Sequence, residues 1–320
     1  MNRVEVLAPD GAPEVRPGAD LAEVLLPLVE LADGDIVVVT SKVVSKAEHR
    51  VVLGNRDDLV AGETVRVVAR RGPTTIARTR HGLTMAAAGI DASNVATGSV
   101  VLLPLDPDAS ARRIRTGIRV RAGRNVGVVV TDTAGRAWRE GQTDIAIGAA
   151  GLLVAEVYAG RTDAHGNELA VTLPAVADEI AGAAELAQGK LTARPFAVVR
   201  GRHDLVLPPG EDGPGATSLV RAEGSDLFGY GAREAVVRAL KGAPGDRAPF
   251  GAPAEAAELA ASITDVLGLV PSVSHRDGGS LTVTHPRGLA RALAALAFAH
   301  GWEVLPTDSV SDARLRPARP

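Results

Sequence analysis

The stretch GVVVTDTAGRAWREGQTDIAIGAAG, from Gly127 to Gly151, decides the fold of this chain. Its three valines at 128–130 are typical of a buried strand. A polar run from Thr131 to Arg136 follows, and the pattern becomes apolar again only at Ile145. Open α/β sheets bind ligands just beyond the carboxyl ends of such strands, so this run indicates a metal–phosphate site. A surface turn in which Asp132 caps the next segment is the alternative interpretation.

Strand and helix patterns alternate on both sides of this stretch and predict a mixed α/β (α+β) fold. Strands are predicted at 4–7, 35–40, 65–68, 100–103, 152–158 and 196–199. Helices are predicted at 21–31, 108–119 and 174–188, with Asp108 as the N-cap of the second. A Gly/Pro-rich segment at 241–253 predicts a boundary between a core of residues 1–245 and a small C-terminal α/β module of residues 246–320. In that module we expect helices at 254–267 and 286–300 and strands at 280–284 and 302–305.

The composition excludes several classes of function. The 320 residues carry a net charge of −3, which gives no long-range attraction to nucleic acid or anionic membrane. The chain has no cysteine, so disulfides, thiolate catalysis and cysteine-bound metals are excluded. A metal would need oxygen or histidine ligands, and carboxylates favour magnesium or manganese. The N-terminus lacks the apolar core of a signal peptide, and no apolar run is long enough to cross a bilayer, so we expect a cytoplasmic protein.

Two polar segments lie beside predicted elements, and the first of them offers groups for phosphate binding. Ser41 and Lys46 directly follow the strand predicted at 35–40, where hydroxyl and ammonium groups bind phosphate oxygens through charge-assisted hydrogen bonds. The glycine framework of a P-loop is absent, and a solvated basic turn is the alternative. Gln188 and Gly189 follow a predicted helix, where the glycine also suits a helix C-cap.

Two further segments offer metal ligands and anion-binding groups: Asp91, Asn94, Asp132, Thr133, Arg136 and Arg139. Asp91 and Asp132 can share divalent ions that bridge nucleotide phosphates, while nearby arginines clamp anionic groups of the substrate. Asx residues are also common in turns, so each segment alone remains open to a structural interpretation.

Four long motifs, in chain order, carry a resemblance to a known family. They are RTRHGLTMAAAGIDASNV at 78–95, VVLLPLDPDASARRIR at 100–115, VVVTDTAGRAWREGQTDIAIGAAGL at 128–152 and VADEIAGAAELAQGKL at 176–191. Together they resemble the coenzyme F420-0:L-glutamate ligase family, and the similarity extends from about Val4 to about Leu240. The resemblance implies an unusual mixed α/β core, an intertwined homodimer and a GTP-dependent amide ligase. That ligase joins L-glutamate by γ-linkage to F420-0 in F420 biosynthesis.

The resemblance also implies roles for individual residues. The nucleotide would contact Gly11, Ala12, Pro13, Glu14, Ser41, Lys46, Asn94 and the segment that begins with Gln188 and Gly189. Mg²⁺ or Mn²⁺ would bind Asp91, Asp132 and Thr133, with K⁺ as a further cation. Catalytic roles would fall to Lys46, Arg136 and Arg139. The chain departs from the family at Ala12, where a larger apolar residue is commoner, and at Lys190. This lysine aligns with a metal-contacting glutamine of some members and is a poor metal ligand.

The expected mechanism passes through an acyl phosphate. The carboxylate of F420-0 would attack the γ-phosphate of GTP, and the amine of glutamate would then displace phosphate. No residue is evident as the base for the amine. A metal-dependent phosphohydrolase and a non-catalytic GTP-binding module fit the same polar segments, and only the extent of the family resemblance separates them.

Overall fold

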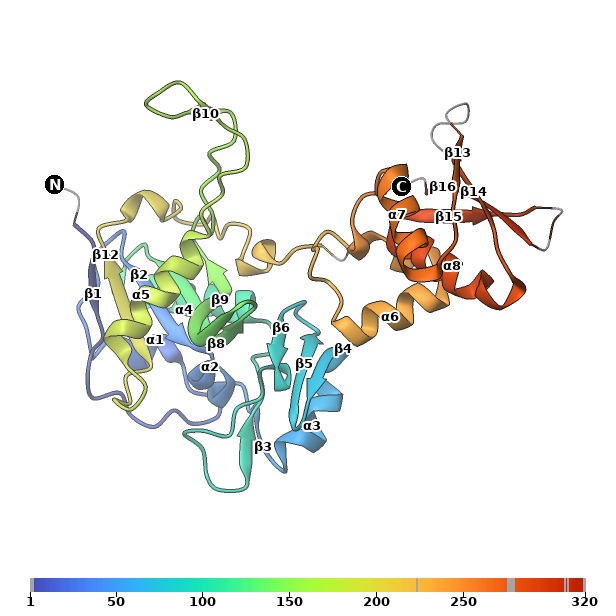
Figure 1. The fold of residues 1–320 in the computed structure, drawn as a ribbon. Coiled ribbons are helices and arrows are strands. Elements are labelled where there is room, and N and C mark those ends of the chain that lie inside the picture. The colour runs from blue at the N-terminus through green and yellow to red at the C-terminus, as the bar shows by residue number, and fades with distance from the viewer. Residues whose placement is uncertain (1–2, 223, 275–279, 308, 310, 319–320) are drawn as a thin grey trace. The chain divides into compact units, whose positions relative to one another are not determined.

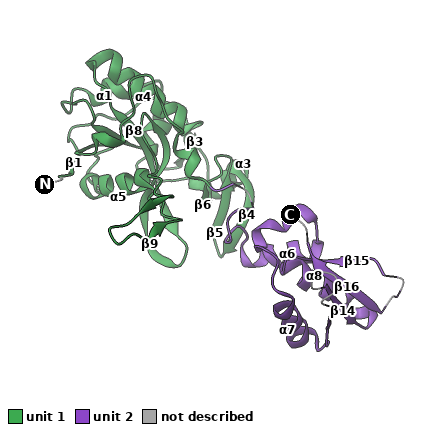
Figure 2. Cartoon of the chain, turned by 90° about the horizontal axis from the view of Figure 1, so that it is seen from above, with its two compact units in different colours: residues 1–220 green, residues 221–320 purple. Residues whose placement is uncertain are grey.

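The computed structural model describes residues 3–222, 224–274, 280–307, 309 and 311–318. The chain forms two compact units, Met1–Val220 and Arg221–Pro320 (Figure 2), and both contain helices and strands. The predicted mixed α/β fold class is therefore confirmed. The division falls before the boundary predicted at 245/246, because α6 (Ala232–Lys241) packs against α8 (Ala290–Ala299) of the second unit.

A five-stranded sheet forms the centre of the first unit (Figure 1). Its order is β1 (Glu5–Leu7), β12 (Phe196–Arg200), β2 (Ile36–Thr40), β8 (Gly127–Arg136) and β9 (Arg139–Ala150). Only β2 and β8 run parallel, and their register pairs Thr40 with Thr131. Because parallel strands end at the same edge of a sheet, the residues that follow Thr40 and Thr131 lie side by side.

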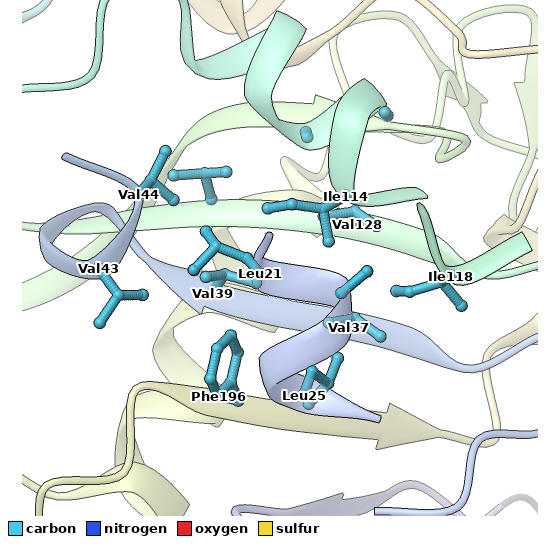
Figure 3. Close-up of a cluster of buried hydrophobic side chains, with 14 of the residues drawn as sticks. Leu21, Leu25, Val37, Val39, Val43, Val44, Ile114, Ile118, Val128 and Phe196 are labelled. Carbon is cyan, nitrogen blue, oxygen red and sulfur yellow. The ribbon is translucent and has the colours of Figure 1, made fainter. Parts of the chain in front are cut away.

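Both faces of this sheet are buried, as the continuous apolar runs of β2 and β8 predict. Alternate residues of β2 point to opposite faces, so Val37 and Val39 belong to one core and Val38 belongs to the other. The first core, which Figure 3 shows, packs beneath α1 (Leu21–Leu25), α2 (Ser41–Ala47) and α4 (Pro107–Ala122). Helix α5 (Val176–Gln188) covers the other face against β9 and β12.

Smaller elements complete the two units. The first unit also contains α3 (Arg56–Glu63) and the strand pair β3 (Val51–Leu53) and β7 (Ser99–Val101). A three-stranded sheet follows, with β4 (Thr64–Arg71), β5 (Thr74–Thr79) and β6 (Thr84–Ala86). Strands β10 (Arg161–Thr162) and β11 (Glu168–Leu169) form a projecting hairpin (Figure 1). The second unit has an antiparallel sheet in the order β13 (Ser272–Ser274), β14 (Ser280–Thr284), β16 (Asp312–Pro317) and β15 (Trp302–Leu305). Helices α6 and α7 (Ala256–Leu267) both pack against α8. None of the described helices is long and apolar enough to cross a membrane.

The most consequential correction concerns the polar run at 131–136. It is not a loop, because β8 continues through Arg136 and forms a hairpin with β9, in which Asp132 pairs with Ile145. The antiparallel partner satisfies the backbone groups of the polar residues, so they remain in the strand. Asp132 therefore lies within a strand and does not end one.

Other differences have local causes. The residues after β2 form α2 and not a turn. The first helix ends at Leu25, because Pro27 restricts the residue before it and has no N–H group. Asp106, and not Asp108, caps α4, by accepting a hydrogen bond from the backbone of Ala109.

Residues 152–158 form no strand. The chain leaves the sheet at Gly151, whose φ is +65°, and Leu152 makes only an isolated bridge to Val206. In the second unit, the helix predicted at 286–300 begins with a 3₁₀ turn at Arg287–Leu289, and β16 was not predicted.

Candidate functional site

The site is centred on the shared edge of β2 and β8. Strand β2 passes directly into α2 at Ser41, while β8 continues through Asp132. The hydroxyl of Ser41 donates a hydrogen bond to Oδ1 of Asp132 over 2.8 Å, across 91 positions of sequence. The structure thus brings together two of the residues predicted at the two strand ends.

Asp132 lies in an environment that disfavours its negative charge. Burial of the carboxyl group raises its pKa to about 7, and the charges of Asp144 and Asp91 act in the same direction. The hydrogen bonds from Ser41 and from the backbone of Thr133 oppose this rise without cancelling it. A cation beside Asp132 would restore the charged form, so the oxygen donors here suit a divalent ion.

Asp91 forms an ion pair with Lys42 of α2. The Lys42 ammonium lies 2.7 Å from Oδ2 of Asp91 and also donates to the hydroxyl of Ser93 over 2.6 Å. Burial acts to raise the pKa of Asp91, but the hydrogen bonds from Lys42 and Ser93 hold it below its ordinary value. Asn94 follows in an exposed left-handed conformation, with φ +57°, so its amide is accessible next to Asp91.

The predicted nucleotide loop lies against the end of α2. Lys46 is buried, and its ammonium lies 2.5 Å from Oε1 of the exposed Glu14. The adjacent Asp10 accepts a 2.7 Å hydrogen bond from Arg194, which belongs to the segment after α5. The loop of Gly11, Ala12, Pro13 and Glu14 is therefore connected both to Lys46 and to the segment that begins at Gln188.

The segment after α5 brings a further cation to β8. Lys190 donates to Oγ1 of Thr133 over 2.8 Å, and its ammonium lies 2.6 Å from Glu185 and 3.6 Å from Asp144. Burial acts to lower the pKa of Lys190, but hydrogen bonds and charge from Glu185 and Asp144 raise it above its ordinary value. Just before it, the buried Gln188 side chain has no hydrogen-bond partner in the described part of the chain.

The sequence did not predict two contributing residues, Asp144 and Glu185, or the pairing of Lys42 with Asp91. Asp144 lies opposite Thr133 in the hairpin and accepts hydrogen bonds from Thr131 and Thr133. Interpretation of the stretch 127–151 as a hairpin would have paired Asp144 with Thr133. Glu185 lies on α5 and is brought to the site only by tertiary packing.

Arg136 and Arg139 lie apart from this cluster. Both are exposed at the end of the β8–β9 hairpin, where Arg136 donates to the carbonyl oxygen of Glu140. A strand rises about 3.3 Å per residue, so four residues place Arg136 about 13 Å along β8 from Asp132. Their assignment to catalysis remains a prediction.

The arrangement offers oxygen ligands to a nucleotide-bound cation. Among the described residues, no three histidine, aspartate or glutamate side chains are grouped to hold a metal ion by themselves. Magnesium that binds together with a nucleotide commonly uses only one or two carboxylates plus phosphate oxygens and water. Asp132 and Asp91, with the hydroxyl of Ser41, fit that smaller role.

Comparisons with known proteins identify the family of this chain. A family model described as F420-0:Gamma-glutamyl ligase matches residues 11–58 and 55–201, a range that contains every residue assigned to the site. The chain is 39% identical over 221 residues to the coenzyme F420:L-glutamate ligase of Archaeoglobus fulgidus, covering 62% of this chain and 88% of that protein. The ligase of the same name from Methanopyrus kandleri is 36% identical over 241 residues, with 67% and 93% covered. That from Natronomonas pharaonis is 37% identical over 256 residues, with 70% and 94% covered. The chain therefore belongs to the F420-0:gamma-glutamyl ligase family.

Proposed function

We propose that this protein joins L-glutamate by γ-linkage to coenzyme F420-0, with GTP as co-substrate, in the biosynthesis of F420. The observation that carries the proposal is the coincidence of the family match with the clustered acids and lysines of the first unit. The names of the relatives supply the two substrates. The same resemblance leads us to propose a homodimer, which light scattering of the purified protein would test.

The ion pair between Lys46 and Glu14 supports a place for the nucleotide phosphates. Lys46 is buried beside the exposed Glu14, so a polyphosphate can take the place of one carboxylate as the partner of the ammonium. The neighbouring loop carries Gly11 at φ +84°, with open space around its Cα, so its backbone is accessible to a ligand. Asn94 would contact the guanine nucleotide from the segment that Lys42 joins to α2.

Asp132 and Asp91 would hold Mg²⁺ or Mn²⁺, which offsets negative charge on the phosphate oxygens when bound. The carboxylate oxygen of F420-0 attacks the γ-phosphorus, the bond to the β–γ bridging oxygen breaks, and GDP leaves. The glutamate amine then attacks the acyl carbon, the C–O bond breaks, and phosphate leaves as the amine loses a proton. Lys46 holds phosphate charge throughout, while Arg136 and Arg139 are proposed to bind anionic groups of the substrate.

Phosphate release from GTP should depend on both acceptors. In an acyl-phosphate mechanism, the γ-phosphoryl group moves first to F420-0, so free phosphate appears only when glutamate completes the reaction. Phosphate release should be measured with GTP and Mn²⁺ alone, with F420-0 added, and with both F420-0 and glutamate, while mass spectrometry monitors F420-1. We expect rapid release and product only in the complete mixture.

The other outcomes of that assay separate the alternatives. Rapid phosphate release without F420-0 would identify a phosphohydrolase. Binding of GTP without either phosphate or F420-1 would identify a non-catalytic nucleotide-binding module.

The chain cut after Val220 should fold and retain glutamylation. Both cores of the central sheet lie wholly within residues 1–220, and so does every residue assigned to the site. Circular dichroism and a thermal melt would report folding, and the F420-1 assay would report activity within about threefold of the full chain. A folded 1–220 protein that binds GTP but forms no F420-1 would show that the second unit contributes to the reaction.

A further inference from the structure

We infer that the ammonium group of Lys190 is a built-in cation of this site, which occupies the position at Thr133 and Asp144 that a second divalent ion would otherwise take. The inference rests on the proposed nucleotide-dependent ligase function. It names a residue that determines how many metal ions the site binds.

The surroundings of the ammonium resemble a cation site made of oxygen atoms. Its oxygen partners are Oε1 of Glu185 at 2.6 Å, Oγ1 of Thr133 at 2.8 Å and Oδ1 of Asp144 at 3.6 Å. They come from α5, β8 and β9, so the packing of three elements creates this position. A lysine ammonium has three donors and no acceptor, which matches this set of oxygens.

The hydrogen bonds at Thr133 leave no room for a metal ion while Lys190 is present. The Thr133 hydroxyl donates its proton to Asp144 over 2.7 Å and accepts from Lys190 on its other side. A magnesium ion bound to that oxygen would lie about 2.1 Å from it. It would then lie within a few ångströms of the ammonium, where like charges repel strongly. Thr133, which the resemblance assigns as a metal ligand, is thus an acceptor for lysine in this chain.

The use of lysine in this chain supports a specific role. The sequence contains 31 arginines but only four lysines: Lys42, Lys46, Lys190 and Lys241. Three of the four lie in the site and contact its acids, and the fourth is exposed at the end of α6. Elsewhere the positive charges are arginines. The ammonium is a compact charge on a flexible stem, which suits a small oxygen-lined position.

Lys190 therefore determines how many divalent ions the site binds. With Lys190 present, one divalent ion binds with the nucleotide at Asp132 and Asp91. With Lys190→Gln, the positive charge is lost, the amide oxygen becomes a ligand, and the oxygens of Thr133 and Asp144 become free for a second ion. Lys190 is half exposed, so the substitution removes little packing.

The test is the number of Mn²⁺ ions bound per protomer in the presence of a non-hydrolysable GTP analogue, measured by electron paramagnetic resonance of free Mn²⁺. We expect one ion for the wild type and two for Lys190→Gln. Lys241→Gln is the matched control for loss of one lysine and should bind one. Lys190→Arg keeps the charge and should also bind one. Circular dichroism would verify that each variant is folded.

Two ions in the wild type, or one ion in Lys190→Gln, would overturn the inference. A wild type that forms F420-1 and binds two ions would leave the proposed function standing while the inference fails. A wild type that neither binds the analogue nor forms F420-1 would overturn the proposed function, and the inference with it. A lysine that only stabilised the end of α5 would leave the Mn²⁺ count unchanged on substitution.

Discussion

Asp132→Asn is expected to lower the rate of F420-1 formation by about a hundredfold or more. Loss of a residue that only supports a metal ligand costs about tenfold to a hundredfold, and loss of the ligand itself should cost at least the upper end of that range. The neutral amide fits the space and can still accept the hydrogen bond from Ser41. It cannot supply the negative charge that a nucleotide-bound Mg²⁺ or Mn²⁺ requires. The measurement is the rate of glutamylation at saturating GTP over a range of Mn²⁺ concentrations.

Asp178→Asn is the matched control, because burial also raises the pKa of Asp178. Its carboxylate accepts a hydrogen bond from the backbone of Ala146, a role that the amide oxygen can fill. We expect a rate close to that of the wild type. A wild-type rate for Asp132→Asn at saturating Mn²⁺ would remove Asp132 from the metal site.

Asp132→Asn should also remove a pH-dependent loss of folding stability that the buried Asp132 carboxyl causes. The folded-state pKa of Asp132 is raised to about 7, so the folded protein holds a proton that the unfolded chain has lost. In EDTA, the contribution of Asp132 to the free energy of unfolding should therefore be fully present below the ordinary pKa of aspartate, fall as the pH rises toward 7, and level off above it. Asp132→Asn should lack this decline, and urea unfolding at pH 5 and pH 8 would measure the difference.

The central sheet and the location of the site could be predicted from sequence because β2 and β8 are continuous apolar runs buried on both faces. Such runs are typical of the middle of an α/β sheet, where ligands bind beyond the strand ends. The hydrogen bond between Ser41 and Asp132 confirms that the two polar segments meet, while ligand binding there stays a prediction. The predicted position of Asp132 at a strand end was wrong. Strand β8 continues through Arg136, because β9 forms hydrogen bonds with the backbone of its polar residues.

Residues that depend on tertiary packing could not be predicted in the same way. Glu185 and Lys42 lie on helices, and nothing in their spacing indicates that they face Lys190 and Asp91. Asp144 was within reach of prediction, because a hairpin register would have placed it opposite Thr133. The division at 220/221 could not be predicted from the Gly/Pro-rich segment, since it depends on which unit α6 packs against.

Lys46→Met is expected to reduce kcat/KM for GTP by about a hundredfold to a thousandfold, as the loss of one preorganised group that stabilises developing charge does. The methionine chain fills the space of the lysine stem in this buried position, so the fold should persist. Steady-state glutamylation with varied GTP would give kcat and KM separately. A rise in KM alone would place Lys46 in ground-state binding, whereas a fall in kcat would place it on the transferring phosphoryl group.

Glu14→Gln tests whether the ion pair itself matters. It weakens the same 2.5 Å contact but leaves the Lys46 ammonium and the loop backbone in place. Since Glu14 is exposed and competes with phosphate for that ammonium, we expect kcat/KM within about threefold of the wild type, with any change in KM toward tighter GTP binding. Equal losses in Lys46→Met and Glu14→Gln would assign Lys46 to holding the loop and would refute its role at the phosphates. A large loss in Lys46→Met alone would mean that the ammonium, freed from Glu14 by the incoming nucleotide, acts on GTP itself.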